Sequence, residues 1–157
     1  MSDLVRDEIL RLRQAFVTND KDGTLVEKVK EIINVMPDRC FGVTYTIGTE
    51  AGNEIIVSCQ FTTLDGDDLA EAVCVQQYLS SDSAGQTRVA AATSLAGGTD
   101  GTVLVEYTSN SIWSAVSETD GDLDIVIGDA SGAATYYLNT VLPNGKLATS
   151  SVITFAA

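Results

Sequence analysis

Histidine is absent from this sequence of 157 residues. Without it, the Ser-His-Asp and Cys-His arrangements of nucleophilic catalysis are excluded, and the commonest metal-binding side chain is missing. The three cysteines, Cys40, Cys59 and Cys74, are odd in number, far apart and without a CxxC pair. We therefore expect neither a disulfide framework nor a structural zinc site. Each cysteine lies in an apolar run, which favours a small buried thiol.

Long apolar stretches are missing as well. No segment approaches the ~18 consecutive apolar residues that a membrane-spanning helix requires. Residues 1–14 are charged throughout and lack the apolar centre of a secretory signal. Because 45% of the residues are hydrophobic and 20% are charged, the composition is that of a folded chain and not of a disordered one. We expect one main domain with a sizeable core, in the cytosol or released without secretion.

Basic residues are scarce after residue 39. The chain has nine Lys and Arg against 22 Asp and Glu, a net charge of −13. Residues 1–39 contain seven basic and eight acidic residues, whereas residues 40–157 contain two basic residues, Arg88 and Lys146, and fourteen acidic ones. A body with a net charge of −12 repels a phosphate backbone, so nucleic acid and anionic membranes are not expected as partners. The change in charge density predicts an N-terminal arm over 1–39 and a separate domain over 40–157.

The arm has the apolar spacing of two short helices. Residues 3–17 carry an apolar stripe at spacings of four, three and four, and a second helix is predicted between the capping box at 24–27 and Pro37. Two interpretations remain open: the helices pack on the domain or on each other, or they dock on a neighbouring subunit or a larger assembly. The candidate docking residues are Val5, Ile9, Leu12, Phe16, Val29 and Ile33.

From Cys40 onward the apolar period changes from 3.6 to two, which predicts strands. Val89 to Thr93 is expected to be a strand or a loop, the Gly-rich segment 96–101 a turn, and Pro143-Asn144-Gly145 a hairpin. Many short strands separated by turns, with no helical pattern between them, indicate a mainly β domain, an antiparallel β-sandwich. The expected strands cover residues 41–47, 55–61, 72–79, 103–108, 112–117, 123–127, 135–142 and 147–155.

An acidic segment at 118–124 is the sharpest candidate site. At a period of two, Asp120, Asp122 and Asp124 project to one side of a strand, while Leu123 and Ile125 project to the other. Three carboxylates in this spacing suit a hard cation such as Ca²⁺. The alternative is an acidic, solvated face of a half-buried strand. Residues 65–68 form a second acidic turn, which is expected to be a solvated loop.

The sequence does not favour an enzyme. Paired carboxylates for glycoside hydrolysis are compatible with the spacing of the acidic residues. Sugar-cleaving enzymes, however, usually line their grooves with aromatic side chains, and aromatic residues make up only 6% of this chain. Its single tryptophan, Trp113, alternates with apolar neighbours as a core residue does. No catalytic residue is predicted.

Four segments carry a resemblance to a known group of proteins. Residues 75–82, 98–101, 116–125 and 137–147 together resemble the strands and turns of an Ig-like β-sandwich module in structural proteins of tailed bacteriophages. The resemblance covers residues 52–157 and implies an antiparallel Ig-like β-sandwich, here preceded by the short arm of two helices. It carries no catalytic residues.

The same resemblance implies a place in the virion, assembled in the host cytoplasm. A capsid decoration or cement protein on the outside of the phage head is expected, with the major capsid protein or other virion proteins as partners. A homo-oligomer is expected too, and a trimer is our guess. The alternative is a tail, fibre or baseplate-associated module that binds a host surface or glycan.

Overall fold

The computed structural model describes residues 40–91 and 93–156. The two helices predicted at 3–17 and 24–36 lie outside these residues. In the part described, no helix is long and apolar enough to cross a membrane. The strands are β1 (Gly42–Ile47), β2 (Glu54–Thr62), β3 (Cys74–Ser80), β4 (Arg88–Val89), β5 (Ser94–Gly97), β6 (Thr102–Thr108), β7 (Ile112–Val116), β8 (Asp122–Gly128), β9 (Ala134–Val141), β10 (Leu147–Thr149) and β11 (Ile153–Phe155).

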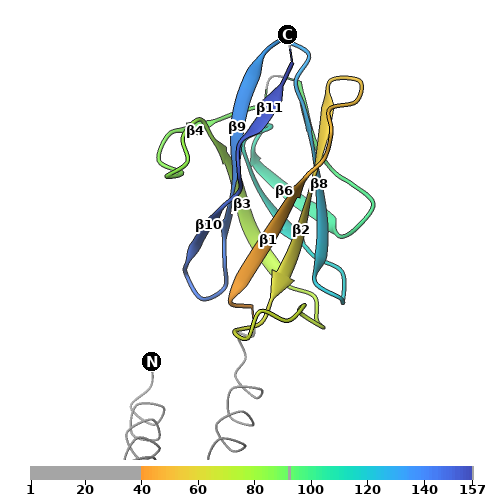
Figure 1. Ribbon diagram of the computed structural model, residues 1–157, viewed down its shortest axis with the longest axis vertical. Helices are drawn as coiled ribbons and strands as arrows, with labels where there is room; N and C mark the ends of the chain where they lie inside the picture. Colours follow the sequence, from red (N-terminus) through yellow and green to blue (C-terminus); the bar gives the residue numbers. More distant parts are fainter. Residues whose placement is uncertain (1–39, 92, 157) are drawn as a thin grey trace, which may run out of the picture. The chain divides into compact units, whose positions relative to one another are not determined.

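Two antiparallel sheets form the domain (Figure 1). The first has four strands in the order β1-β2-β8-β5. The second has the order β10-β9-β3-β7-β6, with β4 beside β3 and β11 beside β9. Every strand pair is antiparallel. The prediction of a mainly β, antiparallel sandwich is therefore confirmed for the described part of the chain.

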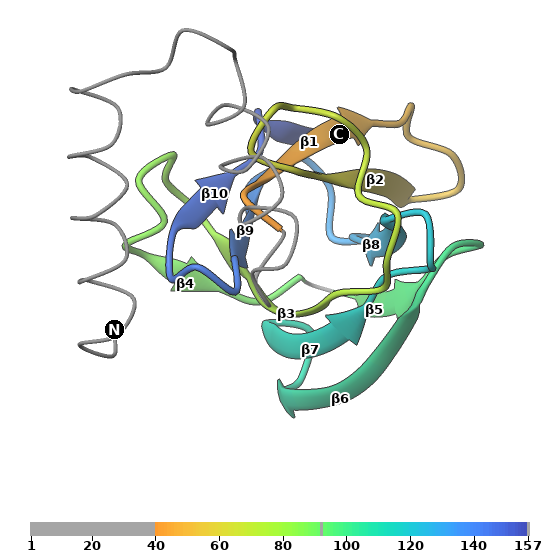
Figure 2. The same ribbon diagram turned by 90° about the horizontal axis from the view of Figure 1, so that it is seen from below.

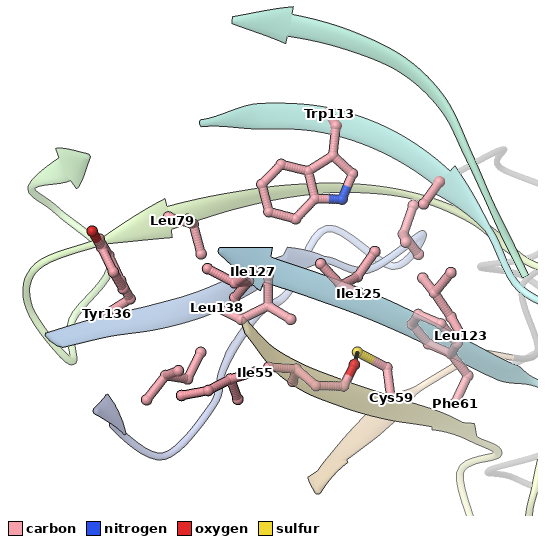
Figure 3. Packing of buried hydrophobic residues seen from close by; sticks show 14 of the residues in the cluster. Ile55, Cys59, Phe61, Leu79, Trp113, Leu123, Ile125, Ile127, Tyr136 and Leu138 are labelled. Carbon is pink, nitrogen blue, oxygen red and sulfur yellow. Dashed lines mark hydrogen bonds between the residues drawn. The ribbon is translucent and has the colours of Figure 1, made fainter. Parts of the chain in front are cut away.

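The core lies between the sheets and follows the period-two pattern (Figure 3). In β2 the side chains of Ile55, Val57, Cys59 and Phe61 are buried, while the intervening ones face outward. Strand β8 buries Leu123, Ile125 and Ile127 in the same way. The second sheet contributes further buried side chains: Val75, Leu79, Trp113, Ala115, Tyr136, Leu138, Ile153 and Phe155. Trp113 is fully buried, so its prediction as a core residue is confirmed.

A chain of buried polar groups crosses this core. The Trp113 indole Nε1 donates to Gln77 Oε1 at 3.0 Å, and Gln77 Nε2 donates to Thr140 Oγ1 at 3.0 Å. The hydroxyl of Tyr45, in the opposite sheet, lies 2.8 Å from Thr140 Oγ1 and 3.1 Å from the carbonyl oxygen of Ala148. Because buried polar groups are costly unless they are paired, these bonds fix how the two sheets face each other.

The structure corrects three details of the sequence prediction. Ser94 to Gly97 form strand β5, although the sequence predicts a turn for residues 96 and 97. The single strand predicted at 147–155 is two strands, because Ser150 interrupts it: the Ser150 hydroxyl oxygen accepts the Leu138 N–H at 2.9 Å. Cys74 is exposed, whereas Cys40 and Cys59 are buried as expected.

The predicted hairpin at Pro143-Asn144-Gly145 is confirmed. It joins β9 to β10, and Leu142 N–H donates to Lys146 O at 2.9 Å across the turn. Gly145 has a φ of 79°, a left-handed conformation that glycine adopts without steric cost.

Candidate functional site

The three acidic residues singled out in the sequence lie in the turn before β8 and on β8 itself, where the chain passes from the second sheet to the first. Asp120 is exposed in the turn, and Asp122 and Asp124 follow on β8. Asp122 and Asp124 pair with Gln60 and Ser58 of β2 on the outer face of the four-stranded sheet, while Leu123 is buried on the inner face. The alternation predicted for this strand is confirmed for Asp122, Leu123 and Asp124, whereas Asp120 lies in the turn before the strand.

Asp124 is less accessible than Asp120 and Asp122. Only 8% of its surface is exposed, and the Ser58 hydroxyl donates to its Oδ1 at 2.6 Å. The chain between β5 and β6 lies directly against it: Gly98 N–H donates to Asp124 O at 2.9 Å, and Asp124 N–H donates to Asp100 O at 2.9 Å. This covering segment is distant from Asp124 in sequence, so spacing within the acidic segment gives no sign of it.

Four neighbouring carboxylates act on Asp122. Burial, followed by the negative charges of Asp120, Asp100, Asp68 and Asp124, raises the pKa of Asp122 above its ordinary value of 3.8. We call these five residues, Asp68, Asp100, Asp120, Asp122 and Asp124, the acidic cluster. Four segments supply it: the loop after β2, the loop between β5 and β6, the turn before β8, and β8 itself.

The negative charge of the acidic cluster would favour a bound cation, and the sequence predicts Ca²⁺. Calcium takes six to eight oxygen ligands. Among residues 40–91 and 93–156, no group of three or more Asp, Glu, Cys or His side chains is arranged to hold a metal ion. Calcium binding by Asp120, Asp122 and Asp124 stays a prediction, which the following substitution tests.

Replacing Asp122 by Asn is expected to raise the melting temperature at neutral pH and low salt. A raised pKa means that the folded state binds the proton more tightly than the unfolded state, so stability falls as pH rises from about 3.8 through the folded pKa. The gain from Asp122→Asn should shrink in high salt, which screens the repulsion, and vanish below about pH 3.8. Thermal unfolding at several pH values and salt concentrations measures it.

Asp82→Asn serves as the control, and we expect it to change the melting temperature in the opposite direction. The backbone N–H groups of Gln86 and Thr87 hold the pKa of this exposed carboxyl below its ordinary value, so Asp82→Asn should lower the melting temperature. If calcium binds the acidic cluster, added Ca²⁺ will stabilise the wild type and not Asp122→Asn. With chelator present, no calcium can bind. If Asp122→Asn then has a lower melting temperature than the wild type, the other carboxylates do not destabilise the fold by repelling Asp122.

Gly98 is required for the close approach to Asp124. A Cβ atom at residue 98 would lie 2.5 Å from the Asp124 Cβ. We expect Gly98→Ala to destabilise the fold by about 1–3 kcal/mol, as overpacking does. Gly97→Ala is the matched control, because its Cβ would make ordinary contact, at 3.5 Å from Val103 N. Urea denaturation of both variants measures the difference, and equal stabilities would contradict this account.

A second surface feature was not predicted. Strand β6 exposes Leu104, Val105 and Tyr107, by 55%, 45% and 58%. We call these three residues the β6 apolar surface. The sequence predicts a strand over residues 103–108, but an alternating pattern does not reveal whether that strand is covered on either face. Its place at the margin of the second sheet, beyond β7, is visible in Figure 2.

The other residues singled out in the sequence are the docking residues and the cysteines. The docking residues Val5, Ile9, Leu12, Phe16, Val29 and Ile33 lie outside the described residues. Burial raises the pKa of the Cys40 thiol to about 11 and that of the Cys59 thiol to about 12, so both stay protonated at neutral pH.

Comparison with known proteins gives little. No protein-family model matches the chain, and no curated protein matches it. A solved structure, the GAE domain of GGA2p from Saccharomyces cerevisiae, is similar over 78% of this chain and 93% of that one, with 14% sequence identity and a TM-score of 0.22.

Proposed function

We propose that this chain is a non-enzymatic virion structural protein, a capsid decoration or cement protein that binds the outside of a phage head and stabilises it. The β-sandwich is then an Ig-like module of the kind its sequence resembles. The arm over residues 1–39 contributes to docking on the major capsid protein or another virion protein. The protein is assembled into the virion in the host cytoplasm, as a homo-oligomer.

The observation that carries the proposal is the β6 apolar surface on an otherwise acidic body. Residues 40–157 contain fourteen carboxylates and two basic groups. Like charge of this size keeps free copies apart before assembly, whereas three neighbouring apolar side chains on one strand favour contact with another protein. A protein that stays separate until it meets its partner is suited to decorating a particle.

Electron microscopy of purified phage particles tests the proposal. We expect the protein to copurify with particles and to account for density on the head, and antibody labelling should mark the same place. Density at the tail or fibre would favour the alternative, a module that binds a host surface or glycan. Recovery of the protein only as a free monomer in the lysate would contradict any virion role.

A further inference from the structure

Strand β6 is distorted at the two positions that expose the most apolar surface. In its register with β7, Val103 pairs with Ala115 and Val105 with Ser114, so Leu104 has no residue opposite. Glu106 then pairs with Trp113 and Thr108 with Ile112, which leaves Tyr107 without one. Seven residues of β6 thus run beside five of β7. Such bulges turn side chains away from their regular direction.

Leu104 and Tyr107 are therefore exposed because the backbone of β6 is bulged at these two positions, and not because the end of the strand is frayed. The hydroxyl of Tyr107 lies 2.9 Å from the Ser114 hydroxyl, which holds its ring near β7. Exposed apolar residues elsewhere in the described chain, such as Leu64 and Val152, stand singly in sequence. Tyrosine is among the residues enriched at the positions that dominate the energy of protein contacts.

The bulges also argue against binding in which another chain adds a strand to the edge of the sheet. Beyond β6 the described residues supply no further strand, so its outer edge is open. A bulged, twisted edge is a poor template for adding a strand from another chain. Recognition at β6 must therefore depend on side chains and not on a continued ladder of backbone hydrogen bonds.

Among the described residues, the charged side chains in β6 and next to it in sequence are acidic. Glu106 lies within the strand and Asp100 just before it, and the sequence has no Lys or Arg between Arg88 and Lys146. Arg88 lies in β4 beside β3, and Lys146 lies in the hairpin to β10, at the opposite edge of the second sheet from β6. A second copy of this domain would bring the same negative charge and be repelled. Charge complementarity selects a partner that is positive at this place.

We infer that the β6 apolar surface binds a protein segment that presents apolar side chains flanked by Lys or Arg, with Leu104 and Tyr107 as anchors and the negative charge of the domain attracting the basic flank. This inference names the chemistry of the partner and rests on the proposed function only for the place where that partner is found. The segment contacts β6 through its side chains.

Two fluorescent peptides serve as probes for the full chain. They share an apolar Leu-Val centre and differ only in their flanks, which are Lys in one and Glu in the other. We expect the Lys-flanked peptide to bind, with an affinity that falls as salt is added. The double substitution Leu104→Ser and Tyr107→Ser should weaken binding by about tenfold or more. Fluorescence anisotropy measures both effects.

The control is the double substitution Leu147→Ser and Val152→Ser. It removes two apolar side chains of 46% exposure each, from outside β6. It should change affinity by less than about twofold, since residues outside a contact contribute little. All the substituted residues are exposed, so circular dichroism should show the wild-type fold in both variants. Equal binding of the two peptides, or equal losses from the two double substitutions, would overturn the inference.

Three further outcomes are decisive, and the last two separate this inference from the proposed function. If sedimentation velocity shows self-association that the β6 substitutions abolish, the occupant is a second copy and the inference is wrong. If the Lys-flanked peptide binds at β6 but the protein does not bind particles, only the virion role fails. If the protein binds particles as well with the β6 substitutions as without them, only the inference fails.

Discussion

Trp113→Ala should destabilise the domain by about 3–5 kcal/mol, the largest loss expected from any single substitution in the core. The indole is fully buried and is the largest side chain in the core. Its removal leaves a cavity between the sheets, and it deprives Gln77 Oε1 of its donor. Because the whole stability of a domain is about 5–15 kcal/mol, the variant should be partly unfolded well below the melting temperature of the wild type. Urea denaturation followed by far-ultraviolet circular dichroism, which does not depend on tryptophan, measures the change.

Trp113→Phe separates packing from hydrogen bonding. It keeps most of the ring volume but removes the Nε1–H, and the expected loss is about 1–3 kcal/mol for leaving a buried acceptor without its donor. Gln77→Leu should cost a similar amount, because Trp113 and Thr140 both lose a partner. If Trp113→Phe is as stable as the wild type, the polar chain across the core contributes no stability.

Asp129→Ala is expected to have the second largest effect, a loss of about 2–3 kcal/mol at neutral pH. This carboxylate, at the end of β8, is only 2% exposed. Ser131 donates to it through both its backbone N–H and its hydroxyl, and the Tyr136 hydroxyl donates to the other oxygen. Tyr136→Phe, which removes a single donor, is the matched control and should cost less.

The stabilisation of the fold by the Asp129 carboxylate should depend on pH. Burial by itself would raise its pKa, but the hydrogen bonds from Ser131 and Tyr136 outweigh burial and hold the pKa below the ordinary value of 3.8. The folded state therefore favours the ionised form, and this stabilisation is complete above about pH 4 and lost as pH falls through the folded pKa. The gap in unfolding free energy between wild type and Asp129→Asn should narrow below about pH 4. A gap that widens in acid would contradict this explanation.

Much of the fold could be predicted from local pattern, and the exceptions have physical causes. Strands such as β2 and β8 bury one face, so alternation reveals them. The sequence predicts a turn for part of β5 because Ala96 and Gly97 are small and glycine-rich segments usually are turns. It is a strand because β8 offers it a partner, Gly97 pairing with Ile125. Pairing between distant segments is invisible to a pattern within either one.

The candidate surfaces were predictable to a smaller extent. Alternation placed Asp122 and Asp124 on the outer face correctly. It did not reveal that the segment at Gly98 covers Asp124, nor that Asp68 and Asp100 approach Asp122. The exposure of Leu104 and Tyr107 depends on two bulges, which arise from the match of β6 to β7 and leave no mark in the residues of β6 themselves.

The order of strands has a consequence for how fast the domain folds. The central pairs join segments far apart in the chain: Ser58 lies opposite Asp124, and Gln77 opposite Thr140, separations of 66 and 63 residues. Neither pair can form until a loop of that length has closed, which places folding in the range of milliseconds to seconds. The hairpin of β6 and β7 is local and can form first. Until the long loops close, the β6 apolar surface would be exposed on a partly folded chain. Binding of a partner at β6 during this time would compete with aggregation of partly folded chains.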